Sequence, residues 1–253
     1  MVDMNQEDPR VLDTIDNLDS PLDSLEDFES EAPPPPDPEE MLLLLQNSQS
    51  QQRIIAARAF CEIKDERAIP LLINLLEDTC PLTRVSAVYG LGRNSSPDAV
   101  EPLIKLLQRD WNGYVRKGVV WALGNNLDSR ALKPLIKALK TDISAVRLWA
   151  ASSLVEIAQL EYESVVTAMP PLVEALRGDL VAPVRSNCAW AVGQLSRELP
   201  ANVVYATAID ALIEALAEDP DLGVKEDAKT ALLKVGDPRG LKMIEELEQE
   251  GWI

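Results

Sequence analysis

One pattern recurs along this chain and constrains its fold more than any other feature. Each copy has an apolar stretch, a turn with an aspartate, a cation five or six residues later, and a second apolar stretch. The copy at residues 102–124 reads PLIKLLQRDWNGYVRKGVVWALG. Its leucines, isoleucines and valines recur at steps of three or four, which places them on one face of each of two helices. Each copy therefore predicts one antiparallel helix pair.

The landmarks of the pattern return in register. The first helix of successive copies is marked by Pro70, Pro102, Pro134, Pro171 and, in the fifth copy, Ala211; the turn aspartates are Asp78, Asp110, Asp142, Asp179 and Asp219; the cations are Arg84, Arg116, Arg147, Arg185 and Lys225. The period is 31–32 residues at first and lengthens to 37 and 40. One helix pair cannot bury both of its apolar faces alone, so a period of this size is typical of a solenoid of stacked pairs.

Each landmark has an expected structural role. The prolines should start or kink the first helix within its first two turns. Gly92, Gly124 and Gly193 are expected to end the second helix. The turn aspartate should cap the second helix or accept from the arginine of its own or the next repeat. An exposed Asp–Arg pair contributes at most about 1 kcal/mol, so the regular spacing favours partly buried pairs with a structural role.

The chain divides into two regions of different composition. Residues 1–40 contain fourteen acidic residues and one basic residue, and a polyproline run occupies residues 33–36. We expect residues 1–38 to form an acidic leader that is disordered in isolation. Residues 39–253 are expected to fold as an all-α solenoid of about six helix pairs. A charged helix near residues 239–250 would cap its end.

Part of the leader has an amphipathic pattern. Apolar residues recur there at steps of three or four: Leu12, Ile15, Leu18, Leu22, Leu25 and Phe28. Acidic residues fill most of the positions between them, as in segments that fold against a partner. Two interpretations remain open, one in which the leader binds a separate partner and one in which it lies on the chain's own first repeat.

A row of aromatic residues marks the predicted second helices. If these helices line the concave side of the solenoid, Tyr89, Trp121, Trp149 and Trp190 should face a groove, with Arg58, Arg93 and Asn125 at its rim. Tryptophan and tyrosine dominate the energetics of many protein interfaces, so this row predicts a protein-binding groove. The alternative is that the rings fold down and fill gaps between repeats.

Composition argues against several classes of function. There is no histidine, which excludes His-based acid–base chemistry, triads and His metal sites. The net charge of −18 and the lack of a basic face argue against nucleic-acid binding. Three cysteines without paired spacing indicate a reducing compartment. Apolar runs are too short to span a membrane, and no signal peptide is visible, so we expect a cytoplasmic protein without membrane insertion.

The repeat consensus DxxxxVRxxAxxALG resembles a known family. The segments DWNGYVRKGVVWALG and DLVAPVRSNCAWAVG are similar to the HEAT-like repeats of the phycobilin lyase E/F-type (CpcE/RpcE/PecE) family, over roughly residues 39–245. The acidic, proline-rich leader and the compact array resemble the IscA-interacting HEAT-repeat proteins of cyanobacteria. These resemblances imply a HEAT-repeat solenoid in iron–sulfur or phycobilisome assembly, in the cytoplasm or at the periphery of thylakoid complexes.

Two functions follow, together with a weaker third. The first is a non-catalytic adaptor that binds an iron–sulfur carrier or a phycobiliprotein or photosynthetic subunit in the aromatic groove. The alternative is a bilin lyase or bilin chaperone, in which the groove stacks on a linear tetrapyrrole and Arg58 and Arg93 reach its propionates. The third uses Cys80, beside Pro81 in a turn, to share an iron–sulfur cluster with a partner. The absence of catalytic spacing favours a protein that is not an enzyme.

Overall fold

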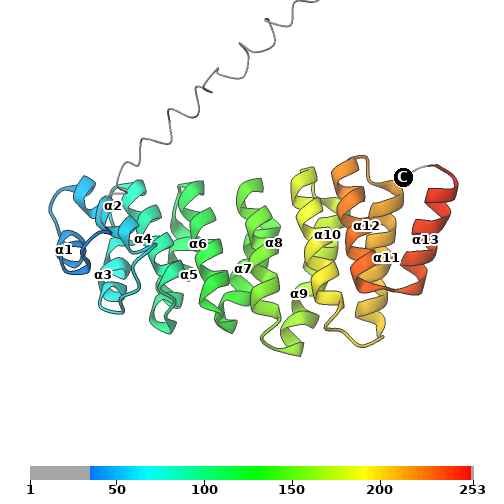
Figure 1. The fold of residues 1–253 in the computed structure, drawn as a ribbon, viewed down its shortest axis with the longest axis horizontal. Helices are drawn as coiled ribbons and strands as arrows, with labels where there is room; N and C mark the ends of the chain where they lie inside the picture. Colours follow the sequence, from blue (N-terminus) through cyan, green and yellow to red (C-terminus); the bar gives the residue numbers. More distant parts are fainter. Residues whose placement is uncertain (1–34, 252–253) are drawn as a thin grey trace, which may run out of the picture. The chain divides into compact units, whose positions relative to one another are not determined.

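The computed structural model describes residues 35–251, and the predicted amphipathic segment at 12–28 lies outside them. Within this range the regular structure is entirely helical, as the repeat predicts (Figure 1). The helices are α1 (Pro38–Leu44), α2 (Ser50–Ala59), α3 (Ala68–Leu75), α4 (Pro81–Arg93), α5 (Pro97–Arg109), α6 (Gly113–Asn126), the 3-10 helix η3 (Ser129–Ala131), α7 (Leu132–Thr141), α8 (Ser144–Ala158), α9 (Tyr162–Gly178), α10 (Ala182–Ser196), α11 (Val203–Glu218), α12 (Leu222–Val235) and α13 (Pro238–Gln249).

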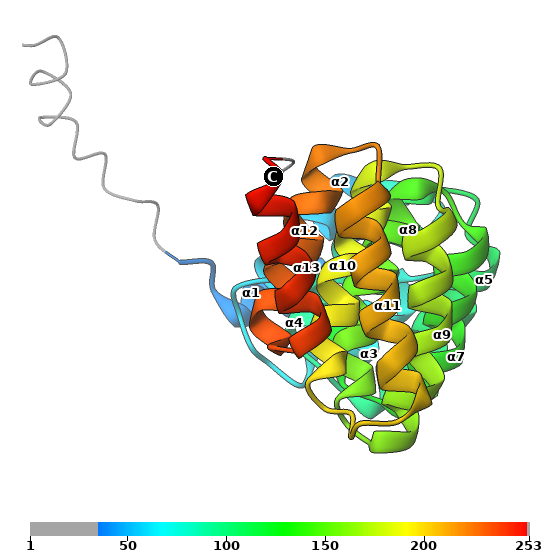
Figure 2. The ribbon, with the colours of Figure 1, turned by 90° about the vertical axis from the view of Figure 1, so that its right-hand side faces the viewer.

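The helices form two layers within the compact unit that begins at Asp37. The second helices of the pairs, α2, α4, α6, α8, α10 and α12, follow one another in one row and are called the B helices (Figure 1). The first helices of the pairs, the A helices, form the other row, and α5, α7 and α9 lie together on one side in the view along the stack (Figure 2). The B helices pack more closely on each other than the A helices do, which places them on the inner side of the curve.

Apolar side chains from both layers fill one continuous core. In the third pair, Leu103 and Leu106 of α5 meet Val115, Val119 and Leu123 of α6, and all five are buried. The predicted apolar faces are therefore the faces that the stack covers. Because each B helix contacts both its own A helix and the neighbouring B helices, burial depends on the adjacent repeats.

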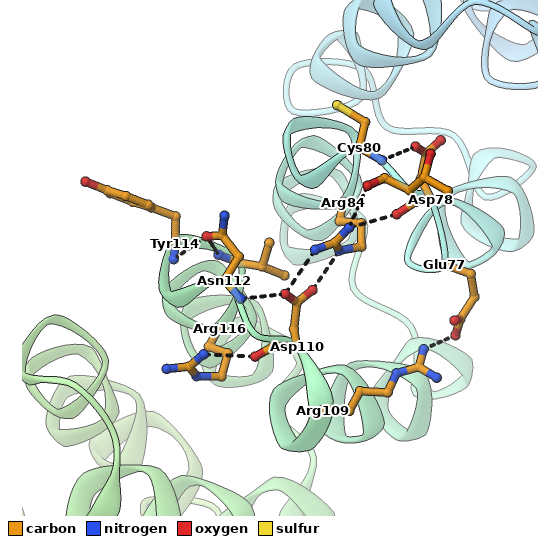
Figure 3. Close-up of polar contacts among 11 residues, drawn as sticks. Glu77, Asp78, Cys80, Arg84, Arg109, Asp110, Asn112, Tyr114 and Arg116 are labelled. Carbon is orange, nitrogen blue, oxygen red and sulfur yellow. Dashed lines mark hydrogen bonds and ion pairs between the residues drawn. The ribbon is translucent and has the colours of Figure 1, made fainter.

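Aspartate–arginine pairs join neighbouring repeats, but each turn aspartate accepts from the arginine of the preceding repeat and not, as predicted, from that of its own or the next repeat. In every pair the arginine Nε of one repeat donates to Oδ2 of the turn aspartate in the next repeat, at 2.6–2.8 Å: Arg53–Asp78, Arg84–Asp110, Arg116–Asp142, Arg147–Asp179 and Arg185–Asp219. Each arginine also donates from Nη1 to a backbone carbonyl just before its own B helix, at 2.8 Å. These five pairs, which we call the ladder, thus connect each turn to the next one, and Figure 3 shows the Arg84–Asp110 pair.

The third turn shows how a ladder aspartate is held. Asp110 accepts two bonds from Arg84, from Nε at 2.7 Å and from Nη2 at 3.0 Å, and a third from the backbone N–H of Asn112 at 2.9 Å (Figure 3). Asn112, not the aspartate, caps α6, since its Oδ1 accepts from the N–H groups of Tyr114 and Val115. The ladder aspartate therefore stabilises the turn and the contact with the preceding repeat.

The repeated glycines have a different role from the one predicted. Gly124 and Gly193 lie two and three residues before the ends of their B helices, whereas Gly92 is the next-to-last residue of α4, close to the predicted end. A Cβ on Gly193 would lie 2.6 Å from Cβ of Ala231, and one on Gly124 would lie 2.9 Å from Cβ of Ser153. The glycines are needed because adjacent B helices approach closely at these points, and not because a helix must end there.

The proline register also differs in one repeat. Helix α9 begins at Tyr162, so Pro170 and Pro171 lie in its third turn instead of its first or second. The segment that follows the long loop near Glu161 has therefore joined the helix and extended it to 17 residues. None of the described helices is long and apolar enough to cross a membrane.

Candidate functional site

The candidate site is the B-helix face, the side of the B helices that points away from the A helices. Tyr89 of α4, Trp121 of α6, Trp149 of α8 and Trp190 of α10 lie on it, one on each of four successive B helices. All four rings are half-buried, and the three tryptophans pack against the core. The rings are therefore neither sealed inside the stack nor fully open.

Two of the rings contact each other across a repeat boundary. The centroids of Tyr89 and Trp121 are 5.1 Å apart with their planes at 49°. The Trp121 ring lies over Gly92, where a Cβ would approach its Cζ3 to 2.4 Å, so only glycine admits the ring there. Cζ of Arg93 lies 5.6 Å from the Trp121 ring centroid, within reach of a cation–π interaction. Tyr89, Arg93 and Trp121 thus form one cluster on α4 and α6.

A second stack follows on the next helices. Nζ of Lys117 in α6 lies 5.5 Å from the centroid of Trp149 in α8. Trp190 is separate from both stacks and borders a small cavity of about 20 Å³ between α10 and α12, next to Arg197 and Thr230. The four predicted rings therefore follow one another along the array. A cationic side chain lies beside the Tyr89–Trp121 cluster, beside Trp149 and beside Trp190.

The predicted rim residues occupy different places. Arg58, Arg93 and Asn125 are all exposed. Arg58 lies in α2, one helix before the Tyr89 cluster, and has no ion pair among the described residues. The backbone carbonyl of Asn125 accepts from the hydroxyl of Ser95 at 2.9 Å, which leaves its side chain outside that contact.

Four residues of the face were not predicted: Leu82, Tyr114, Lys117 and Arg197. Leu82 and Tyr114 lie seven residues before Tyr89 and Trp121, so two helical turns place them on the same face. Tyr114 is 78% exposed and points away from the ladder (Figure 3). Following the same helix face two turns further toward the start of each B helix would have predicted both residues. Lys117 and Arg197 could be found only from the structure, which places each of them beside a tryptophan ring of the B-helix face.

The larger hollows of the described unit lie elsewhere. One of about 590 Å³ separates α9 from α11, and another of about 630 Å³ separates α3 from α5. Both arginines of the first are already paired, Arg185 with Asp219 and Arg177 with Glu214. We therefore place the candidate site on the B-helix face and not in these hollows.

Cys80 precedes α4 directly and is partly exposed. The hydroxyl of Ser50 and the backbone N–H groups at the start of α4 lower the pKa of its thiol to about 7. Burial raises the pKa of Cys61, and it raises that of Cys188 to about 12. The described residues contain no group of three or more His, Cys, Asp or Glu side chains placed to hold a metal ion.

Comparison with known proteins agrees with this architecture. The family model of HEAT repeats matches residues 38–124 and 100–193. No curated protein sequence matches the chain. The crystal structure of an engineered protein is 26% identical and covers 79% of this chain and 98% of its own, with a TM-score of 0.61.

Two further solved structures share the fold at lower identity. A designed armadillo repeat protein in complex with the peptide (KR)4 is 22% identical, with coverages of 78% and 98% and a TM-score of 0.61. The complex of CpcE and CpcF of phycocyanin lyase from Nostoc sp. PCC7120 is 24% identical, with coverages of 86% and 84% and a TM-score of 0.59. Since the HEAT matches together span residues 38–193, more than half of the sequence, this chain belongs to the HEAT-repeat family.

Proposed function

We propose that this protein is a non-catalytic scaffold that binds a segment of another protein along its B-helix face. The observation that carries the proposal is the line of half-buried rings with cations beside them. Half-burial fixes each ring in place, so little conformational freedom is lost when a partner covers its open side. Rigid aromatic rings of this kind are typical anchors of protein interfaces.

A matched pair of exposed aromatic residues allows a direct test. Tyr114 at the start of α6 is 78% exposed and lies on the B-helix face, whereas Trp111 is 77% exposed and lies in the turn beside Arg109 and Leu106. We expect Tyr114→Ala and Trp121→Ala to reduce binding of a captured and then purified partner by at least about tenfold in titration calorimetry. Trp111→Ala should bind as the wild type does. Equal binding by all variants would reject the B-helix face as the site.

The proposed partners come from the resemblance of the repeats. The likeness to the cyanobacterial IscA-interacting HEAT-repeat protein IaiH supports an iron–sulfur carrier, and the likeness to lyase repeats supports a phycobiliprotein subunit. Binding of each purified candidate to the wild type and to Trp121→Ala would decide between them.

If an iron–sulfur carrier binds, Cys80→Ser tests whether this thiol helps to hold a cluster. Full retention of the cluster by this variant after anaerobic reconstitution would exclude Cys80 as a ligand.

Bilin handling is a second proposed function. It is favoured by the stacked cations and rings, which would suit a planar tetrapyrrole with propionate groups, and by the fold shared with the CpcE–CpcF complex. Phycocyanobilin mixed with the protein should then change its visible absorption, and Trp121→Ala or Arg93→Ala should weaken the change. An unchanged spectrum, with and without a candidate second subunit, would reject this function.

A further inference from the structure

Negative charge is missing from most of the B helices. The chain contains 42 acidic and 24 basic residues, but α2, α4, α6 and α10 contain no aspartate or glutamate. Each of these helices has at least one arginine. Among the A helices, α3 and α7 also lack acidic residues, whereas α5, α9 and α11 each expose carboxylates such as Glu101, Glu174 and Glu214. We call the part of the B-helix face that carries Arg58, Arg93 and Lys117 the cationic strip, because the helices α2, α4 and α6 that present them contain no carboxylate.

The arginines on this strip are also the unpaired ones. Among the described arginines, all but Arg58, Arg93 and Arg197 form an ion pair with a carboxylate. These three are exposed; Arg58 and Arg93 lie in B helices, and Arg197 directly follows one. Lys117, over the Trp149 ring, has no carboxylate partner in this part of the chain either. The protein has an excess of carboxylates, yet none of the described ones pairs with Arg58, Arg93 or Arg197. The guanidinium groups of these three arginines therefore remain available to an external anion.

The spacing of the cations indicates what kind of anion would fit. Arg58, Arg93 and Lys117 lie on the successive helices α2, α4 and α6, and packed helices are about 8–10 Å apart. A peptide in the polyproline II conformation advances about 3.1 Å per residue with three residues per turn, so about three residues span one repeat and every third side chain faces the same way. A segment that crosses the B helices with an acidic residue about every third position could therefore pair with successive cations. Apolar side chains between the acids would meet the rings.

We propose that the B-helix face binds an acidic segment of a partner protein in which a carboxylate and an apolar side chain recur about every third residue. This inference rests on the proposed scaffold function and specifies the chemistry of its ligand. The carboxylates pair with Arg58, Arg93 and Lys117, and the apolar side chains cover Tyr114 and Trp121. The cationic strip, the three unpaired arginines and the stacked rings all favour this ligand over a basic or a neutral one.

Three synthetic peptides test the inference on the full chain. Each has about twelve residues with leucine at every third position, the period of the polyproline II conformation, and they differ only in having Asp, Asn or Lys before each leucine. We expect tryptophan fluorescence to report saturable binding of the Asp peptide, weakened by at least about tenfold when salt rises from about 50 to 500 mM. The Lys peptide should not bind. Equal binding of the Asn peptide, or no binding of the Asp peptide, would overturn the inference.

Matched charge changes locate the binding surface. Arg58→Glu and Arg93→Glu should each weaken binding of the Asp peptide by at least about tenfold. Lys133→Glu makes the same change in charge on an exposed, unpaired lysine of an A helix, α7, and should leave the affinity within about twofold. An effect of Lys133→Glu as large as that of Arg93→Glu would show an effect of net charge only, and would overturn the inference.

Two further outcomes separate this inference from the scaffold proposal. If a neutral or basic peptide binds and Tyr114→Ala abolishes its binding, the scaffold proposal stands and the acidic ligand is rejected.

The chain's own leader is also acidic and could occupy the same surface. The Asp peptide is therefore tested on a full-chain variant with Asp13, Asp16, Asp19 and Asp23 changed to Asn. Unchanged affinity supports a separate partner. Binding that tightens about tenfold would assign the surface to the leader and overturn the assignment to a separate partner.

Discussion

At the scale of single residues, the ion pairs between repeats differ in how much each contributes, and the buried ladder pairs contribute more than the exposed pairs outside the ladder. The side chains of Arg84 and Asp110 are 9% and 2% exposed, whereas those of Arg109 and Glu77 are 50% and 66% exposed. Arg84→Met leaves the Asp110 carboxylate buried without its partner, so we expect a loss of about 3–5 kcal/mol in the free energy of unfolding. Arg109→Met should cost less than about 1 kcal/mol. Urea denaturation followed by circular dichroism measures both.

The double variant Arg84→Met/Asp110→Leu separates charge burial from packing. Removal of both charges should recover a large part of the loss, since no ion then remains unpaired. If Arg84→Met is as mild as Arg109→Met, the ladder does not stabilise the stack in this way.

The three thiols should differ in reactivity. With a pKa of about 7, Cys80 is about half thiolate at neutral pH, and the thiolate is the form that reacts with iodoacetamide. Mass spectrometry of the folded protein should therefore find Cys80 modified first and Cys188 last. The rate at Cys80 should rise with pH around a midpoint near 7. Ser50→Ala removes the main hydrogen bond to the thiolate and should raise that midpoint; an unchanged midpoint would refute this assignment.

At the scale of helices, the glycines control how closely the repeats stack. Gly193→Val would force its side chain against Cβ and Cα of Ala231, so α12 must move away from α10. We expect a loss of about 1–3 kcal/mol in the free energy of unfolding. Hydrogen exchange should become faster in α12 and α13, beyond the substitution. Exchange that increases evenly along the chain would argue against a local separation of these repeats.

Gly178 provides the matched control. It ends α9, and a Cβ there would meet nothing within 4 Å. Gly178→Ala should therefore be neutral or stabilise the protein by up to about 1 kcal/mol, because alanine has less freedom in the unfolded chain.

The helices also show what the sequence could and could not predict. The pairs, the ladder residues and their partial burial follow from spacing, because spacing determines which side chains share a face. Position within a repeat could not show that Gly92 lies beneath Trp121, since that contact depends on the neighbouring repeat. The depth of each ring depends on the same packing. Whether the rings bind a partner remains a prediction, as does the role of the leader.

At the scale of the whole molecule, the ladder makes stability depend on pH. Burial tends to raise the pKa of Asp179 and Asp219, but the hydrogen bonds from Arg147 and Arg185, the backbone N–H bonds and the nearby positive charges together outweigh it, so both pKa values lie below the usual 3.8. A carboxyl group whose pKa is lower in the folded state contributes stability above its unfolded pKa and loses it as pH falls through the folded value. We therefore expect the free energy of unfolding to lose this contribution as pH falls below about 4.

The net charge acts in the opposite direction and must be separated from this effect. At neutral pH the chain carries a net charge of −18, and acid relieves the resulting repulsion in every variant alike. The difference in unfolding free energy between the wild type and Asp179→Asn cancels most of that common term. It should be largest at pH 7 and shrink below pH 4, as Asp179 becomes protonated in the wild type. Asp98→Asn, which removes an exposed carboxylate at the start of α5, should show a small difference throughout. A difference for Asp179→Asn that stays constant down to about pH 2 would mean that this ladder carboxylate does not make stability depend on pH.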